Sequence, residues 1–292
     1  MAKIIALANQ KGGVGKTTSS INIAACLAIA EKKTLLIDLD PQGNASVGLG
    51  LSKESHQDQN IYHVIIGQSS LKDATYETAL PYLHICPSDG NLIGAEIELV
   101  SEMAREQKLK NAFATVADDY DYILIDCPPS LGLLTLNALN AANKYIVPLQ
   151  TEYYAMEGFA QLQNTIRLVR SSLNPNLEME GILLTMFDKR TSLHRQVSDE
   201  MRSAFGEKVF KTVIPRDVKL SECPSFGQPI ILYNVESKGA EAYLNVAKEI
   251  LIKNRIQQEK EIKEYGFEEI PAIPEELLQK AQEGQEPTQT LN

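Results

Sequence analysis

The chain has 292 residues, enough for one large α/β domain or two small ones, and its 43% hydrophobic residues can form a substantial core. The net charge of −10 argues against a protein that coats nucleic acid over its whole surface, although it is compatible with a local basic patch. The four cysteines lie far apart and form no C-x-x-C pair, which argues against a zinc site or a disulfide framework and favours buried free thiols.

Short apolar runs alternate with helix-length segments along the chain. The predicted strands are residues 3–9, 34–39, 83–87, 122–127, 145–150, 181–187 and 209–215. The predicted helices are residues 16–30, 92–117, 133–142, 157–173, 193–205 and 239–252. This alternation predicts an α/β fold with a single doubly wound, mostly parallel sheet and helices on both faces.

The composition changes after about Lys253. Residues 253–292 contain nine Glu against five Lys or Arg, and the last ten residues show no apolar periodicity. We therefore expect a folded domain over residues 1–253, and over 254–292 a helical extension to about Glu264 followed by a disordered acidic tail. Such a tail either keeps the protein soluble or binds a partner.

Two features of the sequence bear on its location. No segment resembles a secretory signal, because the N-terminus leads directly into the first predicted strand. The longest apolar run, INIAACLAIA, is too short to span a bilayer. We therefore expect a cytoplasmic protein.

A glycine-rich turn, ANQKGGVGKTT over residues 8–18, joins the first predicted strand to the first predicted helix. This context is typical of a phosphate-binding loop, in which glycines permit a tight turn and backbone N–H groups at a helix N-terminus face an anion. The residues expected to bind nucleotide phosphates are Lys11, Gly12, Gly13, Val14, Gly15, Lys16, Thr17 and Thr18. Lys16 suits the β- and γ-phosphates, and the Thr17 hydroxyl suits Mg²⁺.

Acidic residues follow two other predicted strands. Asp38 and Asp40 end one of them, and Asp126 ends another. Ligands of open parallel sheets bind at the carboxyl ends of the strands, so these carboxylates are candidates to hold Mg²⁺ or to orient the attacking water. A helix-capping or turn-forming role remains open for each, and above all for Asp38, which lies within an apolar run.

The loop departs from the ordinary phosphate-loop pattern, because Gln10 stands where the first glycine is expected and Lys11 is a second lysine. Five blocks in order, KGGVGKTT, DLDPQGNAS, DCPPSLGLLTLNAL, TEYYAMEG and IPRDVKLSECPSFGQPI, resemble the ParA/Soj family of chromosome and plasmid partition ATPases. The resemblance covers about Ala2 to Lys253, and it identifies this region as a deviant Walker A P-loop ATPase domain.

The resemblance implies a dimer that encloses two ATP molecules. Lys11 of each subunit would reach the phosphates of the other, as an arginine finger supplied in trans does, and Gly12 would permit close approach of the two subunits. The implied catalytic residues are Lys11, Lys16 and Asp40, and the implied Mg²⁺ ligands are Thr17, Asp40 and Asp126.

The resemblance also suggests positions around the rest of the nucleotide. Met186, Pro215 and Arg216 match segments on the adenine side of the site. Glu152 or Glu157 would lie near the nucleotide at the dimer interface, although helix capping or plain exposure explains these acids equally well.

Residues 186–219 carry eight Lys or Arg and five acids, a net charge of +3 inside an acidic chain. Such a stretch is either a solvated face or a polyanion-binding surface, and the resemblance favours DNA. The candidate DNA-binding residues are Arg190, Arg195, Lys211 and Lys219. No helix-turn-helix block precedes the loop, so we expect nonspecific, salt-sensitive contacts with double-stranded DNA and a nucleoid-associated protein.

The predicted function is a weak ATPase, stimulated by a ParB/Spo0J-like partner, that forms a homodimer with ATP and drives partition. One alternative is a MinD-like membrane-cycling ATPase, but the C-terminal region lacks a clean basic amphipathic helix. Another is a metabolic P-loop enzyme. A reductase with an iron–sulfur cluster would need a second cysteine suitably placed near Cys127.

Overall fold

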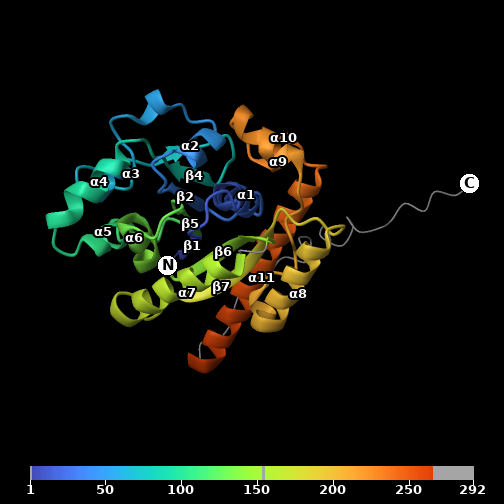
Figure 1. Cartoon of the computed structure of the whole chain (residues 1–292). Coiled ribbons are helices and arrows are strands. Elements are labelled where there is room, and N and C mark those ends of the chain that lie inside the picture. The colour runs from blue at the N-terminus through green and yellow to red at the C-terminus, as the bar shows by residue number, and fades with distance from the viewer. Residues whose placement is uncertain (1, 153–154, 266–292) are drawn as a thin grey trace, which may run out of the picture. The chain divides into compact units, whose positions relative to one another are not determined.

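The computed structural model describes residues 2–152 and 155–265, and the predicted acidic tail at 266–292 lies outside them. The strands of this part of the chain form one sheet in the order β3-β4-β2-β5-β1-β6-β7 (Figure 1). They are β1 Lys3–Leu7, β2 Thr34–Asp38, β3 Tyr76–Glu77, β4 Leu83–Cys86, β5 Tyr122–Asp126, β6 Lys144–Gln150 and β7 Glu178–Thr185. Only the pairing of β3 with β4 is antiparallel within this sheet, so the predicted doubly wound α/β fold is confirmed.

Helices cover both faces of the sheet (Figure 1). The α-helices of the described residues are α1 Lys16–Ile29, α2 Asn44–Gly48, α3 Ile61–Ile65, α4 Leu92–Glu98, α5 Lys108–Phe113, α6 Leu133–Ala141, α7 Ala155–Ser172, α8 Ser192–Phe205, α9 Val218–Glu222, α10 Ile230–Tyr233 and α11 Lys238–Tyr265. Strand residues alternate between the faces, so Ile4 and Ala6 of β1 join the core beneath α6 and α7, whereas Ile5 and Leu7 face the other way.

Register in the sheet decides where the acidic strand ends meet. Asp126 of β5 is level with Leu7 of β1 on one side and with Asp38 of β2 on the other. All three strands run in the same direction, so their carboxyl ends lie at one edge of the sheet. The turn that follows β1 therefore begins beside both carboxylates.

The predicted strand at residues 209–215 is wrong. Val209 forms an isolated bridge to Ile182 of β7, and Pro215 forms one to Phe187 just after β7, but no continuous ladder joins them. Between the bridges, the backbone N–H groups of Lys211 and Thr212 donate to the carboxylate of Glu249, at 2.9 and 2.8 Å. These donors are used by a side chain of α11 and not by a neighbouring strand. The chain bends at Lys211 and Thr212, so the apolar run does not form a continuous strand.

The long helix predicted for residues 92–117 is also wrong, because the segment is broken into several short helices. After α4 the chain forms short 3₁₀ turns at Leu99–Ser101 and Arg105–Gln107 before α5 begins. Ala104, between these turns, has a φ of 52°, which is unfavourable inside a helix. The two-residue strand β3 and the short helices α2, α3, α9 and α10 were not predicted.

By its internal contacts the chain divides into residues 1–249 and residues 250–292, the second unit being described only as the end of α11. The proposed domain boundary at 253/254 stays a prediction. All four cysteines are free and buried. None of the helices in the described residues is both long and apolar enough to cross a membrane.

Glu249→Ala tests the account of residues 209–215. Removing the carboxylate leaves two backbone N–H groups without their partner, so the free energy of unfolding should fall by about 1–2 kcal/mol in urea titrations. Lys248→Ala, at an exposed neighbouring position of the same helix, is the control and should change stability by less than about 0.5 kcal/mol. Equal stability of the two variants would contradict the assigned role of Glu249.

Candidate nucleotide site and its surroundings

The turn between β1 and α1 has the backbone of a phosphate cradle. Gly13 and Gly15 have φ values of 72° and 85°, which residues with a side chain rarely adopt. Gly15 is the N-cap of α1, and no side chain caps the helix there. The free N–H groups and the positive end of a 14-residue helix therefore point at the turn, where an anion would satisfy them.

Two contacts hold this loop against the sheet. The Thr185 hydroxyl, at the end of β7, donates to the carbonyl of Val14 at 2.8 Å. The amide of Asn9 donates to the carbonyl of Pro148 at 2.7 Å, while its oxygen accepts the N–H of Lys11 at 3.0 Å. Strands β6 and β7 thus fix both ends of the loop.

Lys16 is the buried lysine of the loop, with 6% of its surface exposed. Its ammonium group donates to the carbonyl of Lys11 at 3.1 Å. Burial lowers the pKa of Lys16, while the nearby charges of Asp126 and Asp40 act in the opposite direction. A phosphate would add negative charge beside a poorly solvated cation, which suits the role expected from the sequence.

Lys11 points to a different group. Its ammonium forms an ion pair with Glu152 of the same chain, with 2.7 Å between Nζ and Oε2, and both side chains are more than a third exposed. Gln150 donates to the other oxygen of Glu152 at 2.6 Å, so this carboxylate is held in place. The two lysines of the loop therefore differ in environment: Lys16 is buried and Lys11 lies near the surface. The side chain of Glu157 lies outside the described residues.

The three candidate carboxylates also differ. Asp38 accepts hydrogen bonds from the N–H and hydroxyl of Ser46, at 2.8 and 2.7 Å, so it ties β2 to α2. Asp126 accepts from the hydroxyl of Ser20 at 2.8 Å. Burial raises the pKa of both Asp38 and Asp126; the charge of Asp40 adds to the effect on Asp38, and the charge of Asp38 adds to the effect on Asp126. Asp40 begins the following turn, where its side chain accepts the N–H of Gln42 at 3.0 Å.

The chemistry of this edge fits a cation. The Oδ2 atom of Asp126 is buried and has no hydrogen-bond partner among the described residues, an arrangement that a metal ion or its bound water would relieve. Among the same residues no group of three or more His, Cys, Asp or Glu could hold a metal alone. Mg²⁺ needs no such cage, because it is commonly held by one or two protein oxygens together with phosphates and water.

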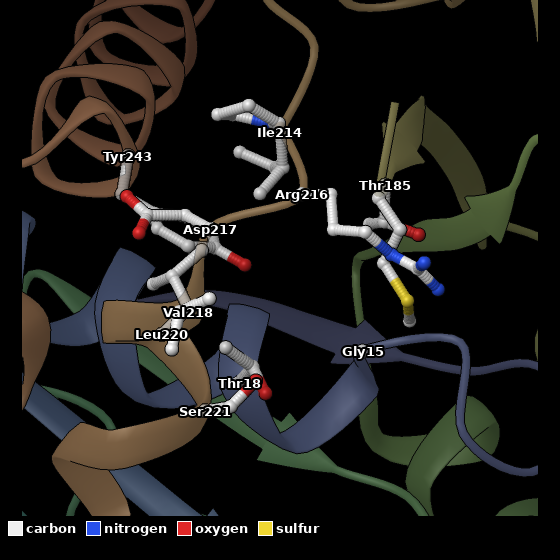
Figure 2. Close-up of a pocket in the computed structure, with 12 residues that line it drawn as sticks. Gly15, Thr18, Thr185, Ile214, Arg216, Asp217, Val218, Leu220, Ser221 and Tyr243 are labelled. Atoms are coloured by element: carbon white, nitrogen blue, oxygen red, sulfur yellow. The ribbon is translucent and has the colours of Figure 1, made fainter. Parts of the chain in front are cut away.

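A cavity of about 360 Å³ extends from the loop between α1 and the segment after β7. Figure 2 shows Tyr243 and Leu220 toward one end, and Arg216 and Thr185 beside Gly15 at the other. Met186, Pro215 and Arg216, which sequence resemblance suggested, all line this cavity together with Gly15 and Thr18.

Several lining residues were missed by the sequence analysis. They are Thr185, Ile214, Asp217, Val218, Leu220, Ser221 and Tyr243. Asp217 had a recognisable signal, because it caps α9 by accepting the N–H of Lys219 at 3.0 Å. Tyr243, whose hydroxyl lies 3.0 Å from that of Ser19, comes from α11 and had none.

The four candidate DNA-binding residues lie on separate elements: Arg190 before α8, Arg195 in α8, Lys211 beside β7 and Lys219 in α9. Arg190 forms an exposed ion pair with Asp188, which lowers the pKa of that aspartate. Lys219 pairs with Glu222 at 2.9 Å. The Arg195 guanidinium donates to the carbonyl of Lys189 at 2.6 Å. Acidic partners thus balance part of the positive charge counted in the sequence.

Comparison with known proteins agrees with this geometry. Residues 2–179 match the AAA_31 family, described as an AAA domain. The chromosome partitioning protein ParA of Myxococcus xanthus is 53% identical over 251 residues, which make up 86% of this chain and 88% of that protein. The sporulation initiation inhibitor protein Soj of Bacillus subtilis is 54% identical over 250 residues, 86% of this chain and 98% of that one. The chain belongs to the ParA/Soj family.

Solved structures extend the similarity to nucleotide complexes. Cobyrinic acid a,c-diamide synthase from Mycobacterium smegmatis, with bound ADP and magnesium, superimposes with a TM-score of 0.77 at 36% identity, covering 87% of this chain and 96% of that one. The septum site-determining protein MinD from Pyrococcus horikoshii, complexed with Mg-ADP, gives a TM-score of 0.71 at 26% identity, covering 86% and 96%. This ParA/Soj chain therefore has the P-loop NTPase fold of the MinD/ParA class.

Ser46→Ala tests the structural role of Asp38. The change removes a donor to a buried carboxylate and an acceptor for the N–H of Ser88, so the free energy of unfolding should fall by about 2–3 kcal/mol. Ser203→Ala, at an exposed position of α8, should stay within about 0.5 kcal/mol of the parent. Urea unfolding of both variants gives the comparison, and an undisturbed Ser46→Ala protein would show that Asp38 has no such role.

Proposed function

We propose that this chain is an ATP-dependent dimerising switch for chromosome or plasmid partition. In the ATP-bound dimer it binds DNA without sequence preference, and hydrolysis, stimulated by a ParB/Spo0J-like partner, releases it. The observation that carries the proposal is the contrast between the two lysines of one loop: Lys16 is buried at the helix N-terminus, whereas Lys11 is near the surface and paired with Glu152.

ATP and Mg²⁺ are the proposed ligands. The phosphates would lie on the loop from Lys11 to Thr18 with Lys16 beside them, and the base would enter the cavity lined by Met186, Pro215 and Arg216. Thr17, Asp40 and Asp126 would hold Mg²⁺. When bound, the ion would neutralise negative charge on the phosphate oxygens. Relatives in this class have been solved with ADP or an ATP analogue and magnesium, which supports the assignment.

Lys11 is the proposed trans-acting group. One ordinary phosphate lysine already serves the subunit's own site, so a second, near-surface lysine is better placed for the phosphates of a partner subunit. Its ion pair with Glu152 must then open when the dimer forms. Both side chains are substantially exposed, and such pairs contribute little to stability, so the exchange is energetically easy.

Asp40 is the proposed coupling residue for hydrolysis. It lies at the start of the turn after β2, with its carboxylate largely buried near Lys16. A carboxylate at this position can orient the attacking water and accept its proton as the new bond to phosphorus forms. The following Gln42–Gly43 turn lets Asp40 respond to the presence of a γ-phosphate, because the turn is held mainly by local bonds.

DNA binding is proposed for the surface that includes Arg190, Arg195, Lys211 and Lys219. The dimer would double the number of these cations, so binding would depend on ATP even if each contact were weak. A protein of this kind would be cytoplasmic and associated with the nucleoid.

Two other functions occur among proteins of this fold. The MinD-like alternative would place the protein at a membrane, and the metabolic alternative would give it a small-molecule substrate, as in the cobyrinic acid a,c-diamide synthase. Partition is favoured because identity is 53% to the chromosome partitioning protein ParA of Myxococcus xanthus and 49% to the chromosome-partitioning ATPase Soj of Treponema pallidum. Over a similar share of the chain it is 36% for the synthase and 26% for MinD.

The proposed function is tested by measuring molecular mass and DNA binding with ATP, with ADP and without nucleotide. We expect a dimer that shifts unrelated DNA duplexes only with ATP, with affinity falling steeply as salt rises. DNA binding that is equal with ATP and ADP would refute nucleotide gating. Binding to anionic vesicles in place of DNA would favour the membrane alternative.

Lysine variants should separate nucleotide binding from dimerisation. Lys16→Ala removes the buried cation and should abolish ATP binding. Lys11→Ala should leave ATP binding within a few-fold of the parent and prevent the ATP-dependent dimer. Glu152→Gln, which frees Lys11, should give the dimer at a lower ATP concentration. Titration with a fluorescent ATP analogue and light scattering measure the two steps, and an ATP-dependent dimer of Lys11→Ala would exclude the trans role.

Asp40→Ala should uncouple binding from hydrolysis. The variant keeps the loop and Lys16, so it should bind ATP, dimerise and remain on DNA while phosphate release falls at least tenfold. Phosphate release and dissociation from immobilised DNA are the measurements. A monomeric Asp40→Ala protein in the presence of ATP would contradict the assigned role.

Arg190→Ala should weaken DNA binding and spare the ATP-dependent dimer. Loss of one phosphate contact per subunit should lower the slope of log affinity against log salt by about 1 to 2 for the dimer. Arg167→Ala, an exposed arginine of α7 outside the basic stretch, is the matched control. Equal losses in both variants would indicate that only net charge matters and that the patch lies elsewhere.

A further inference from the structure

The turn after β2 carries Asp40, and its last residue lies against the backbone of another segment. Hydrogen bonds within the turn are local: the N–H of Gln42 donates to the Asp40 carboxylate, and the N–H of Gly43 donates to the Asp40 carbonyl at 2.9 Å. A methyl group added at Gly43 would come within 2.8 Å of the carbonyl oxygen of Ser88, which follows β4. The position of the turn therefore depends on where that carbonyl is held.

A buried histidine holds the carbonyl of Ser88. His56 ends the 3₁₀ turn Lys53–His56 and is 1% exposed, and its Nε2 atom lies 3.2 Å from the Ser88 oxygen. A carbonyl oxygen only accepts, so Nε2 carries the proton and donates it. The amide of Asn60, the N-cap of α3, donates to the backbone carbonyl of His56 at 3.1 Å. The histidine is thus itself fixed by a neighbouring element.

A second route joins Ser88 to the other end of the turn. The N–H of Ser88 donates to the hydroxyl of Ser46 at 3.0 Å, and that hydroxyl donates to the carboxylate of Asp38 at 2.7 Å. The other oxygen of Asp38 accepts the N–H of Asp40 at 3.3 Å. One chain of hydrogen bonds, here called the His56 relay, therefore runs through the buried residues His56, Ser88, Ser46, Asp38 and Asp40.

We propose that His56 is a positioning residue for ATP hydrolysis, acting through Ser88 on the turn that carries Asp40. The inference rests on the hydrolytic role proposed above for Asp40. His56 fixes Ser88, and Ser88 contacts the last residue of the turn directly and the first through the relay. The Asp40 carboxylate is thereby held in one place before water attacks. A displacement of about 1 Å at a reacting group can lower a rate by about a hundredfold.

Burial excludes direct contact between His56 and the nucleotide, so the histidine acts only through its neighbours. A histidine that merely filled space would need no donor, whereas His56 donates to the carbonyl on which the turn rests. The phosphates would bind the loop from Lys11 to Thr18, which is not part of the relay. Loss of the donor should therefore lower kcat and leave ATP binding unchanged.

His56→Gln and His56→Met are the matched test variants. Glutamine and methionine have nearly the same length and shape, but only glutamine can donate an N–H to Ser88. The full chain is studied with ATP, Mg²⁺ and duplex DNA by phosphate release, and dimerisation is followed by light scattering. His56→Met should lower kcat at least fivefold, keep KM for ATP within twofold and still dimerise with ATP. His56→Gln should restore kcat to within twofold of the parent.

His84→Met controls for the loss of a histidine hydrogen bond elsewhere in the sheet. His84 of β4 is half-buried, and its Nδ1 atom lies 2.8 Å from the hydroxyl of Tyr120, outside the relay. The variant should lower the urea unfolding midpoint and leave kcat within twofold of the parent. If His56→Met behaves in the same way, with a lower midpoint and a parental kcat, His56 has only a structural role and the proposal is overturned.

Asn60→Ser takes the place of His56→Met if that protein does not fold. Serine still caps α3, but the amide that holds the His56 carbonyl is gone. Phosphate release should fall at least threefold at an unchanged KM for ATP. A parental kcat in this variant would then overturn the proposal.

A double variant separates this inference from the proposed role of Asp40. If His56 acts through Asp40, adding His56→Met to Asp40→Ala should change the remaining rate by less than twofold. A further fivefold fall would show that His56 acts by another route, contrary to the proposal. A parental rate in Asp40→Ala alone would refute the role of Asp40. A slow Asp40→Ala protein together with a parental His56→Met protein would refute only the inference about His56.

Discussion

Burial of Lys16 beside the carboxyl ends of β2 and β5 is the constraint on which the site depends. A desolvated ammonium is unfavourable unless negative charge is close. Asp126 at the end of β5 and Asp40 in the turn after β2 supply that charge. Asp126 is also buried beside Asp38, whose like charge raises the pKa of Asp126, so a cation near these carboxylates would be favourable. A phosphate and a divalent cation would complete this balance, one beside the lysine and the other beside the aspartates.

This balance also explains the arrangement of the polypeptide around the site. The parallel sheet places three strand ends together, and hydrogen bonds from Ser20 and Ser46 then hold the carboxylates at those ends. The Thr185 hydroxyl, at the end of the edge strand β7, holds the phosphate-binding loop against the sheet. Most of the polar groups that shape the site thus come from residues that are themselves buried, which makes the site rigid before any ligand arrives.

Much of this arrangement could be predicted from the sequence, because it depends on local patterns. The glycine-rich loop, the acidic strand ends and the strand–helix alternation each have a signal within a few residues. The features that the sequence did not predict depend on residues that are far apart along the chain. Nothing near residues 209–215 indicates that Glu249 binds their backbone, and nothing near Tyr243 places it in the cavity. The pairing of Lys11 with Glu152 joins residues that are 141 positions apart.

The loop between β5 and α6 has two close neighbours. A methyl group added at Gly12 would lie 3.8 Å from Cβ of Pro129, and one added at Gly132 would meet the carboxylate of Glu96 in α4 at 2.5 Å. One short connection therefore borders both the phosphate loop and α4. If a ligand at either place shifts this connection, each ligand must change the affinity of the other by the same factor, because binding free energies around a closed cycle sum to zero.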